Sequence, residues 1–340
     1  MKTTIKRIAS CFLFITLVVV LVVRANQVVL NKEYNRYYYL ADFIEQENKN
    51  YTIQAYGSCH TYTSFDAPYI EETYGVSTYV FANPAEIIPI TYLRMCERFK
   101  TDIPKVVGLD IWGLNGYDTY LSKKDLFEKY MAVNVELLPL SKEKIELIND
   151  YEYLDIINEN FPISKYKDRV LEMEITNVDY AYSFDLVALG DSVHPDGYIN
   201  FIMKEMEVRK NSNGFSRLDH KKETKDLHDY SEKQAHVDSS QTLPYEEDMQ
   251  KYLEKIITLC EDNGVKLVFY RSPYIANENE MKKTNWFANY CRERNIPYYD
   301  LEREVEFNYS TDFQDEWHLN ELGARKATEY LSSKIISLLD

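Results

Sequence analysis

The chain carries few basic residues for its length, with 39 Lys and Arg against 55 Asp and Glu and a formal net charge of −16. A phosphate backbone requires a basic face on its partner, so this balance argues against nucleic-acid binding. The sequence also lacks a phosphate-binding loop, a dinucleotide-binding fingerprint and internal repeats. With 340 residues, 45% of them hydrophobic, it can form one large domain or two small ones with a sizeable core.

Cysteine is also scarce, with five in all: Cys11, Cys59, Cys96, Cys260 and Cys291. Their spacing is irregular and contains no C-x-x-C, so it indicates neither a metal site nor a redox motif. We therefore expect a site that uses no metal and no cofactor. Cys260 and Cys291 fall within predicted helices, where the simplest expectation is a small buried hydrophobic side chain.

The N-terminal segment has the composition of a membrane anchor. Lys2, Lys6 and Arg7 precede an apolar run at residues 8–23, which Arg24 closes. The run is close to the ~20 residues that span a bilayer, and its leading positive charge predicts a cytoplasmic N-terminus. We predict a signal-anchor helix at residues 1–30, a linker at 31–50 and an extracytoplasmic domain at 51–340 of a single-pass cell-membrane protein. A cleaved signal peptide is the alternative.

Short apolar runs alternate with helical patterns in the rest of the chain. The runs predict strands at residues 53–57, 105–112, 265–270 and 296–301, and the patterns predict helices at 245–263, 281–295 and 320–339. This alternation predicts an α/β fold with a mostly parallel central sheet and helices on both faces. We interpret residues 120–243 as an insertion, helical over 123–168 and charged and solvated over 204–243.

Two short motifs carry residues that suit acyl-transfer chemistry. Gly57-Ser58-Cys59-His60 ends the first predicted strand, and Asp315-x-x-His318 comes just before the last predicted helix. At this spacing the Asp315 carboxylate can bind one nitrogen of His318 and fix its tautomer, which leaves the other nitrogen for a nucleophile. A nucleophile, a base and a carboxylate that orients the base are the three parts of a covalent acyl-transfer site.

These motifs, with Asn320-x-x-Gly323 after His318, resemble the SGNH (GDSL-type) hydrolase superfamily. Within it, they are most similar to membrane-anchored envelope proteins with Gly-Ser-Ser-His or Gly-Ser-Ser-Glu in the first block, such as the D-alanine-transfer protein of teichoic-acid modification. The resemblance spans residues 51–340 and implies a three-layer, flavodoxin-like α/β sandwich. It also implies a catalytic triad of Cys59, His318 and Asp315.

The resemblance further implies acyl transfer to, or ester hydrolysis on, an acylated envelope or secreted polysaccharide, with acetyl as the expected group. It implies a multi-pass membrane acyltransferase as a partner. The chain departs from the family at the nucleophile, where Cys59 replaces Ser. A thiol beside a His populates its thiolate and would favour a thioester acyl donor. The alternative is a binding module of weak or no activity that assists the acyltransferase.

The superfamily stabilises its oxyanion with a Gly and an Asn. Asn115, in Gly113-Leu114-Asn115 after the second predicted strand, is the candidate donor, and Asn83 is a second one. A turn built from Gly and Asn explains the same residues equally well.

Two serines are alternative nucleophiles. Ser58 adjoins Cys59, but on an extended strand it points to the opposite face. Ser192 lies in Gly190-Asp191-Ser192, which matches the first block of the superfamily letter for letter. Too few apolar runs lie between Ser192 and His318 to complete a sheet, so we prefer Cys59.

Overall fold

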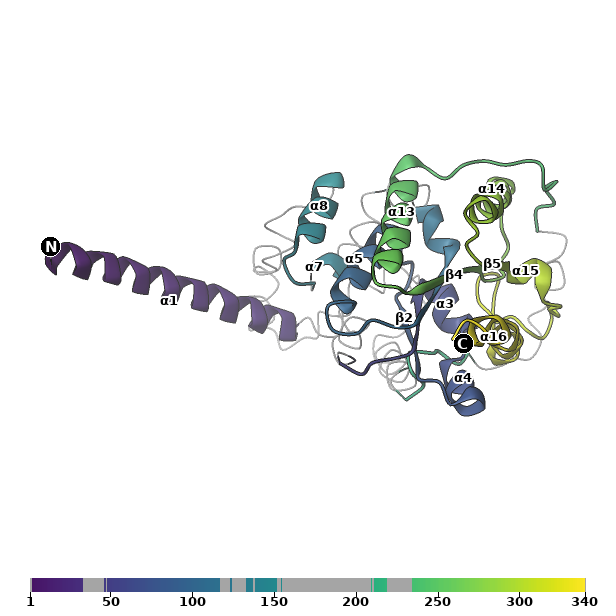
Figure 1. Cartoon of the computed structure of the whole chain (residues 1–340), viewed down its shortest axis with the longest axis horizontal. Coiled ribbons are helices and arrows are strands. Elements are labelled where there is room, and N and C mark those ends of the chain that lie inside the picture. Colours follow the sequence, from purple (N-terminus) through teal and green to yellow (C-terminus); the bar gives the residue numbers. More distant parts are fainter. Residues whose placement is uncertain are drawn as a thin grey trace, which may run out of the picture. The chain divides into compact units, whose positions relative to one another are not determined.

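The computed structural model describes residues 2–32, 46, 48–116, 123, 133–136, 138–151, 154, 209, 211–218 and 234–339. The chain divides into two compact units, one drawn from residues 1–38 and 132–199 and the other from 39–131 and 200–340. The sheet and the candidate site both belong to the second unit. Figure 1 labels the helices and strands of the chain.

The described part of the first unit is helical. It contains α1 (Lys2–Lys32), α7 (Val133–Glu136) and α8 (Lys142–Asp150). Ser141 begins α8 by accepting a hydrogen bond from the Lys144 N–H at 3.1 Å, which satisfies one of the free donors of the first turn. Among the described residues, no helix combines the length and the apolar character needed to cross a bilayer. The membrane anchor at residues 1–30 therefore stays a prediction.

The second unit is built on a five-stranded sheet. Its strands are β1 (Ile53–Gly57), β2 (Thr78–Ala82), β3 (Val106–Asp110), β4 (Lys266–Arg271) and β5 (Tyr298–Asp300). Every pair is parallel and the order is β2-β1-β3-β4-β5. The predicted α/β class with a parallel sheet is confirmed. β2 was not predicted; it is an edge strand, although all five of its residues are buried.

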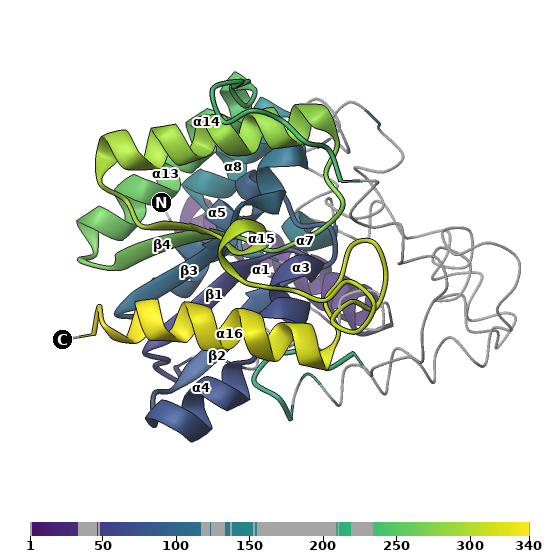
Figure 2. The same ribbon diagram turned by 90° about the vertical axis from the view of Figure 1, so that its right-hand side faces the viewer.

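Helices cover both faces of this sheet (Figure 2). They are α3 (Cys59–Ser64), α4 (Ala67–Tyr74), α5 (Ile88–Arg98), α13 (Glu247–Asp262), α14 (Glu278–Arg294), α15 (Leu301–Glu304) and α16 (Glu321–Ile336), with the 3₁₀ helix η2 (Ile111–Asn115) after β3. Successive strand residues point to opposite faces. Val80 packs in a cluster with Leu331 of α16, whereas the ring of Phe81 lies 4.5 Å from the Arg98 guanidinium of α5. Both faces are therefore dry, which explains the continuous apolar strands.

Part of the polar insertion packs against the sheet. The Asn213 carbonyl accepts a hydrogen bond from the Val80 N–H at 2.9 Å, and Arg209 donates to the Ala82 carbonyl at 2.9 Å. Phe215 is buried. The prediction of a solvated segment over 204–243 is therefore wrong at these residues. Their backbone and side chains occupy hydrogen-bonding groups along β2 that would otherwise be unpaired at the sheet edge.

Candidate active site

Cys59 emerges from a tight turn at the carboxyl end of β1. Gly57 ends the strand with φ at 142°, and Ser58 caps α3 by accepting a hydrogen bond from the His60 N–H at 3.3 Å. Cys59 is the first residue of α3 and is half-buried. The turn therefore places its thiol at the carboxyl edge of the parallel sheet, where ligands of α/β folds bind.

The loop between α15 and α16 carries the histidine and the carboxylate. Asp315 Oδ1 accepts hydrogen bonds from the backbone N–H groups of Trp317 and His318, at 2.8 and 2.9 Å. His318 Nδ1 lies 2.9 Å from Oδ1 and 3.0 Å from Oδ2 of the same carboxylate. The carboxylate therefore fixes the Nδ1–H tautomer, and Nε2 is left for the nucleophile.

The residues after His318 explain why its motif continues as Asn320-x-x-Gly323. Asn320 caps α16 by accepting from the Leu322 and Gly323 N–H groups, and its amide donates to the Thr311 carbonyl at 2.7 Å. A Cβ on Gly323 would come within 2.2 Å of the Asp312 carbonyl oxygen. Glycine thus lets α16 begin in close contact with the loop, and this contact holds His318 in place.

The structure brings Cys59, His318 and Asp315 together. The Cys59 thiol and the His318 imidazole are hydrogen-bond partners. Burial alone would raise the pKa of the Cys59 thiol, but the charge and hydrogen bond of His318 lower it overall. Burial alone would lower the pKa of His318, but the Cys59 thiolate and the Asp315 carboxylate raise it to about 10. The geometry therefore favours a thiolate–imidazolium pair at neutral pH.

Two backbone N–H groups also reach the Cys59 sulfur, those of His60 and Ala85, and both lower the pKa of the thiol. Ala85 lies in the turn after β2, the neighbour of β1 in the sheet, and has φ at 54°. A non-glycine residue in this left-handed region is strained, which is frequent at functional sites. Sequence reasoning missed Ala85 because a backbone donor has no side-chain signature. Its position after a strand that pairs with β1 was the available signal.

Each of the two predicted oxyanion donors has a hydrogen-bond partner within the fold, and their role as donors stays a prediction. Asn115 is buried in η2 and donates from Nδ2 to the Tyr274 hydroxyl at 3.2 Å. Asn83 is buried in the turn that contains Ala85, and its side chain hydrogen-bonds to the Glu86 carboxylate. Glu86 in turn forms a buried ion pair with Arg94 of α5. Asn83 thus supports the turn, while Asn115 lies at the aromatic border of the site.

Of the two alternative nucleophiles, the structure describes only Ser58. Ser58 is fully buried and its hydroxyl is occupied as the cap of α3. Ser192 lies outside the described residues, so its candidacy is unchanged.

Aromatic side chains surround the pair of Cys59 and His318. The Trp317 ring is 45% exposed and stacks on Tyr274, with centroids 6.0 Å apart and an interplanar angle of 18°. His60 and Trp112 are both buried and lie nearby in the same aromatic group. The site therefore has an apolar wall with one ring, that of Trp317, open to solvent.

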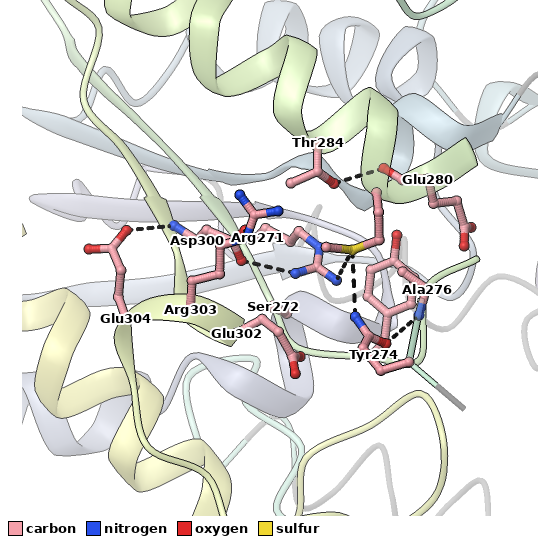
Figure 3. A network of polar contacts seen from close by, with 12 residues as sticks. Arg271, Ser272, Tyr274, Ala276, Glu280, Thr284, Asp300, Glu302, Arg303 and Glu304 are labelled. Atoms are coloured by element: carbon pink, nitrogen blue, oxygen red, sulfur yellow. Dashed lines mark hydrogen bonds and ion pairs between the residues drawn. The ribbon is translucent and has the colours of Figure 1, made fainter. Parts of the chain in front are cut away.

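A buried ionic network lies next to Tyr274 (Figure 3). Arg271, at the end of β4, donates to Asp300 Oδ1 at 2.9 Å, and its guanidinium lies 5.0 Å from the Tyr274 ring centroid. Ser272 donates its backbone N–H to Asp110 Oδ2 at 3.0 Å, which ties the end of β4 to that of β3. These contacts fix the segment that carries Tyr274.

Among the described residues, no cluster of three or more His, Cys, Asp or Glu side chains could hold a metal ion. No protein-family model matches the chain, and no curated protein is significantly similar to it.

Proposed function

We propose that this chain is an extracytoplasmic SGNH-like acyltransferase or esterase, with a Cys59–His318–Asp315 triad and a three-layer, flavodoxin-like fold. The observation that carries the proposal is the thiol of Cys59 in hydrogen-bond contact with His318, whose second nitrogen is bound by Asp315. The parallel sheet with helices on both faces supports the fold, because this chemistry belongs at the carboxyl edge of such a sheet.

In the proposed first step, the Cys59 thiolate attacks the carbonyl carbon of an acyl donor. The His318 imidazolium gives its proton to the leaving group as the bond to that group breaks, and a thioester remains on Cys59. The backbone N–H groups of Ala85 and His60 converge on the sulfur and so lie near the carbonyl oxygen that gains charge.

In the proposed second step, neutral His318 takes the proton of an acceptor hydroxyl whose oxygen attacks the thioester. Cys59 departs as a thiolate, and the thiolate–imidazolium pair is restored. A sugar hydroxyl as acceptor gives acyl transfer, and water gives hydrolysis. Trp317 supports a sugar acceptor because its ring is exposed beside His318 and is already held by Tyr274, so stacking on a sugar face requires little ordering.

The proposal is completed by a polysaccharide acceptor, an acetyl donor group and a multi-pass membrane acyltransferase as partner, all of which rest on the resemblance to the envelope proteins. It also includes the membrane anchor at residues 1–30, which rests on the apolar run and its flanking basic residues.

A second candidate function is a binding module that keeps the fold without catalysis. One observation favours it: the amides of Asn115 and Asn83 bind Tyr274 and Glu86. In this case Cys59 would bind no acyl group, and the site would serve to hold a glycan or the acyltransferase.

The deciding experiment treats the full chain with an acetyl thioester and with p-nitrophenyl acetate, followed by peptide mass spectrometry. We expect an acetyl adduct on Cys59 that hydroxylamine removes and that is absent from His318→Ala. Cys59→Ser is the matched variant for the nucleophile. Fluorophosphonate labelling of Ser58 or Ser192 would show that the nucleophile is a serine, and no adduct on any residue would favour the binding module.

A further inference from the structure

His60 follows the nucleophile directly and is buried among the residues of the site. Its ring stacks on His318, with centroids 5.5 Å apart and an interplanar angle of 28°. It stacks equally on Trp112, at 5.1 Å and 28°. His60 is therefore in ring contact with the proposed base, although it belongs to the helix of the nucleophile.

His60 also reaches the backbone of the loop that carries the base. Its ring donates a hydrogen bond to the Trp317 carbonyl, the group directly before His318 in the chain. The N–H groups of Trp317 and His318 are already bound by Asp315. The peptide units around His318 are thus held by Asp315 from within the loop and by His60 from α3.

The ring of His60 is held in its neutral form. Burial lowers its pKa well below the usual range, and the charges of His318 and Arg271 lower it further, against the opposing effects of the Asp315 charge and the Trp317 carbonyl. Nδ1 is buried and has no hydrogen-bond partner, so protonation there would leave a buried N–H unsatisfied. A neutral ring can lie against the charged imidazolium of His318, whereas a second cation would repel it.

We propose that His60 is a positioning residue that holds His318 against Cys59. Its hydrogen bond to Trp317 ties the loop of the base to the helix of the nucleophile, and its neutral ring provides an aromatic face for the imidazolium. The inference deepens the proposed function, on which it rests for its catalytic meaning. It assigns a role to the fourth residue of Gly57-Ser58-Cys59-His60.

The test is the pH profile of Cys59 alkylation by iodoacetamide in the full chain, mapped by mass spectrometry with an added cysteine-containing peptide as the reference thiol. His60→Phe keeps an aromatic ring but cannot donate to Trp317. We expect its alkylation midpoint to rise by about one pH unit and its rate at pH 6 to fall about tenfold, because the thiolate loses part of its imidazolium partner. His60→Gln keeps an N–H donor without the ring, and we expect a smaller shift in the same direction.

Two control variants separate positioning from general destabilisation. Ser64→Ala removes a buried hydrogen bond between α3 and Ser272, which is 2.8 Å long, without touching His318. His236→Phe makes the same chemical change at an exposed site. We expect Ser64→Ala to lower the thermal midpoint of unfolding and both controls to keep the wild-type alkylation midpoint.

Unchanged alkylation midpoints in folded His60→Phe and His60→Gln would overturn the proposal. If His60→Phe does not fold, His60→Gln decides alone. The test does not depend on acyl transfer. Shifted alkylation midpoints without any acetyl adduct on Cys59 would contradict the proposed function and support the positioning role of His60. Unshifted midpoints with a normal acetyl adduct would support the proposed function and contradict the positioning role.

Discussion

Asp315 binds His318 at two points, since its Oδ1 accepts a hydrogen bond from the His318 backbone N–H at 2.9 Å and lies 2.9 Å from Nδ1 of the ring. One carboxylate therefore sets both the path of the loop and the tautomer of the proposed base. The charge of this group and its shape have separate consequences, and a substitution can separate them.

Asp315→Asn keeps an oxygen that can accept from the backbone but removes the negative charge. We expect acyl transfer to fall by ~10²- to 10⁴-fold, because the imidazolium is no longer stabilised and Nδ1 can meet an amide N–H instead of an acceptor. The unfolding midpoint should change little. The measurement is the rate of Cys59 acetylation together with thermal unfolding. If Cys59 of this variant is acetylated at the wild-type rate, the proposed role of Asp315 in the triad is wrong.

The pH dependence should differ between alkylation and acylation of Cys59. The pKa of the thiol is lowered and that of His318 is raised to about 10, so we expect the thiolate–imidazolium pair to be lost as the pH rises above about 10. Iodoacetamide needs only the thiolate, so its rate should rise below the usual thiol pKa of ~8.5 and stay level at higher pH. Acylation by an ester with a poor leaving group also needs the imidazolium proton, so its rate should fall above a pH of about 10.

The contrary result would be an alkylation curve with an ordinary midpoint, near that of free cysteine. It would mean that His318 does not stabilise the thiolate in solution. His318→Ala is the control, and its curve should show this ordinary midpoint.

Trp317→Ala should weaken the sugar acceptor and leave the nucleophile intact. The side chain is exposed, and its backbone is held independently by Asp315 and His60. Loss of an aromatic contact of about 0.5–1.5 kcal/mol predicts a KM for a saccharide acceptor about two- to tenfold higher. Alkylation of Cys59, which uses no acceptor, should keep its rate. Trp317→Phe is the conservative variant, and its KM for the saccharide acceptor should lie between those of the wild type and Trp317→Ala. Equal KM values in all three proteins would exclude stacking at this ring.

Gly57→Ala should be far more damaging than Gly75→Ala. Both glycines have positive φ, at 142° and 66°, so each substitution strains the backbone. A Cβ on Gly57 would lie 2.3 Å from Thr61 Oγ1, whereas on Gly75 it would meet nothing within 4 Å. We expect Gly75→Ala to lower the free energy of unfolding by ~1 kcal/mol and Gly57→Ala by several times as much, with α3 displaced. Denaturant unfolding and the rate of Cys59 alkylation measure the two effects.

Arg271→Met tests the buried ionic network next to Tyr274. Arg271 and Asp300 form a nearly dry ion pair, with Nη1 and Oδ1 2.9 Å apart. Removing one partner of a buried pair costs ~3–5 kcal/mol when the other charge stays buried and unpaired. Asp300 would keep the partly exposed Arg303, whose Nε lies 3.3 Å from Oδ2, so we expect a loss at the lower end of this range. The double variant Arg271→Met, Asp300→Asn should recover part of this loss in denaturant unfolding. A double variant as unstable as the sum of the single ones would mean that the pair is not coupled.

Much of the sheet could be predicted from the sequence because its strands are buried on both faces. Residues 53–57 were predicted as a strand and form β1 with the same bounds, and 265–270 correspond to β4 (Lys266–Arg271). Continuous apolar runs next to helical patterns leave few other choices. Thr78–Ala82 was missed because five residues alone do not distinguish a strand from a turn of helix. Residues 53–57 are equally short, but the Gly57-Ser58-Cys59-His60 motif marks their end.

The site was predictable only where side chains carry the chemistry. Cys59, His318 and Asp315 have chemical signatures and recognisable spacing, and the structure brings them together. Ala85 acts through its backbone N–H, and the relation of His60 to Trp317 depends on how two distant segments pack. Neither is encoded in local residue patterns. The burial of Phe215 was missed for a similar reason, since one apolar residue in a charged stretch gives no periodicity.

The contact of Asn213 and Gly214 with β2 has a consequence for self-association of the protein. β2 is an edge strand, and a Cβ on Gly214 would lie 2.2 Å from the Val80 carbonyl oxygen, so the two backbones are in close contact. An edge that is already occupied offers no template for a strand from a second molecule. The segment that contains Asn213 and Gly214 therefore covers this edge, and deleting it should leave β2 open to pairing with a strand of a second molecule.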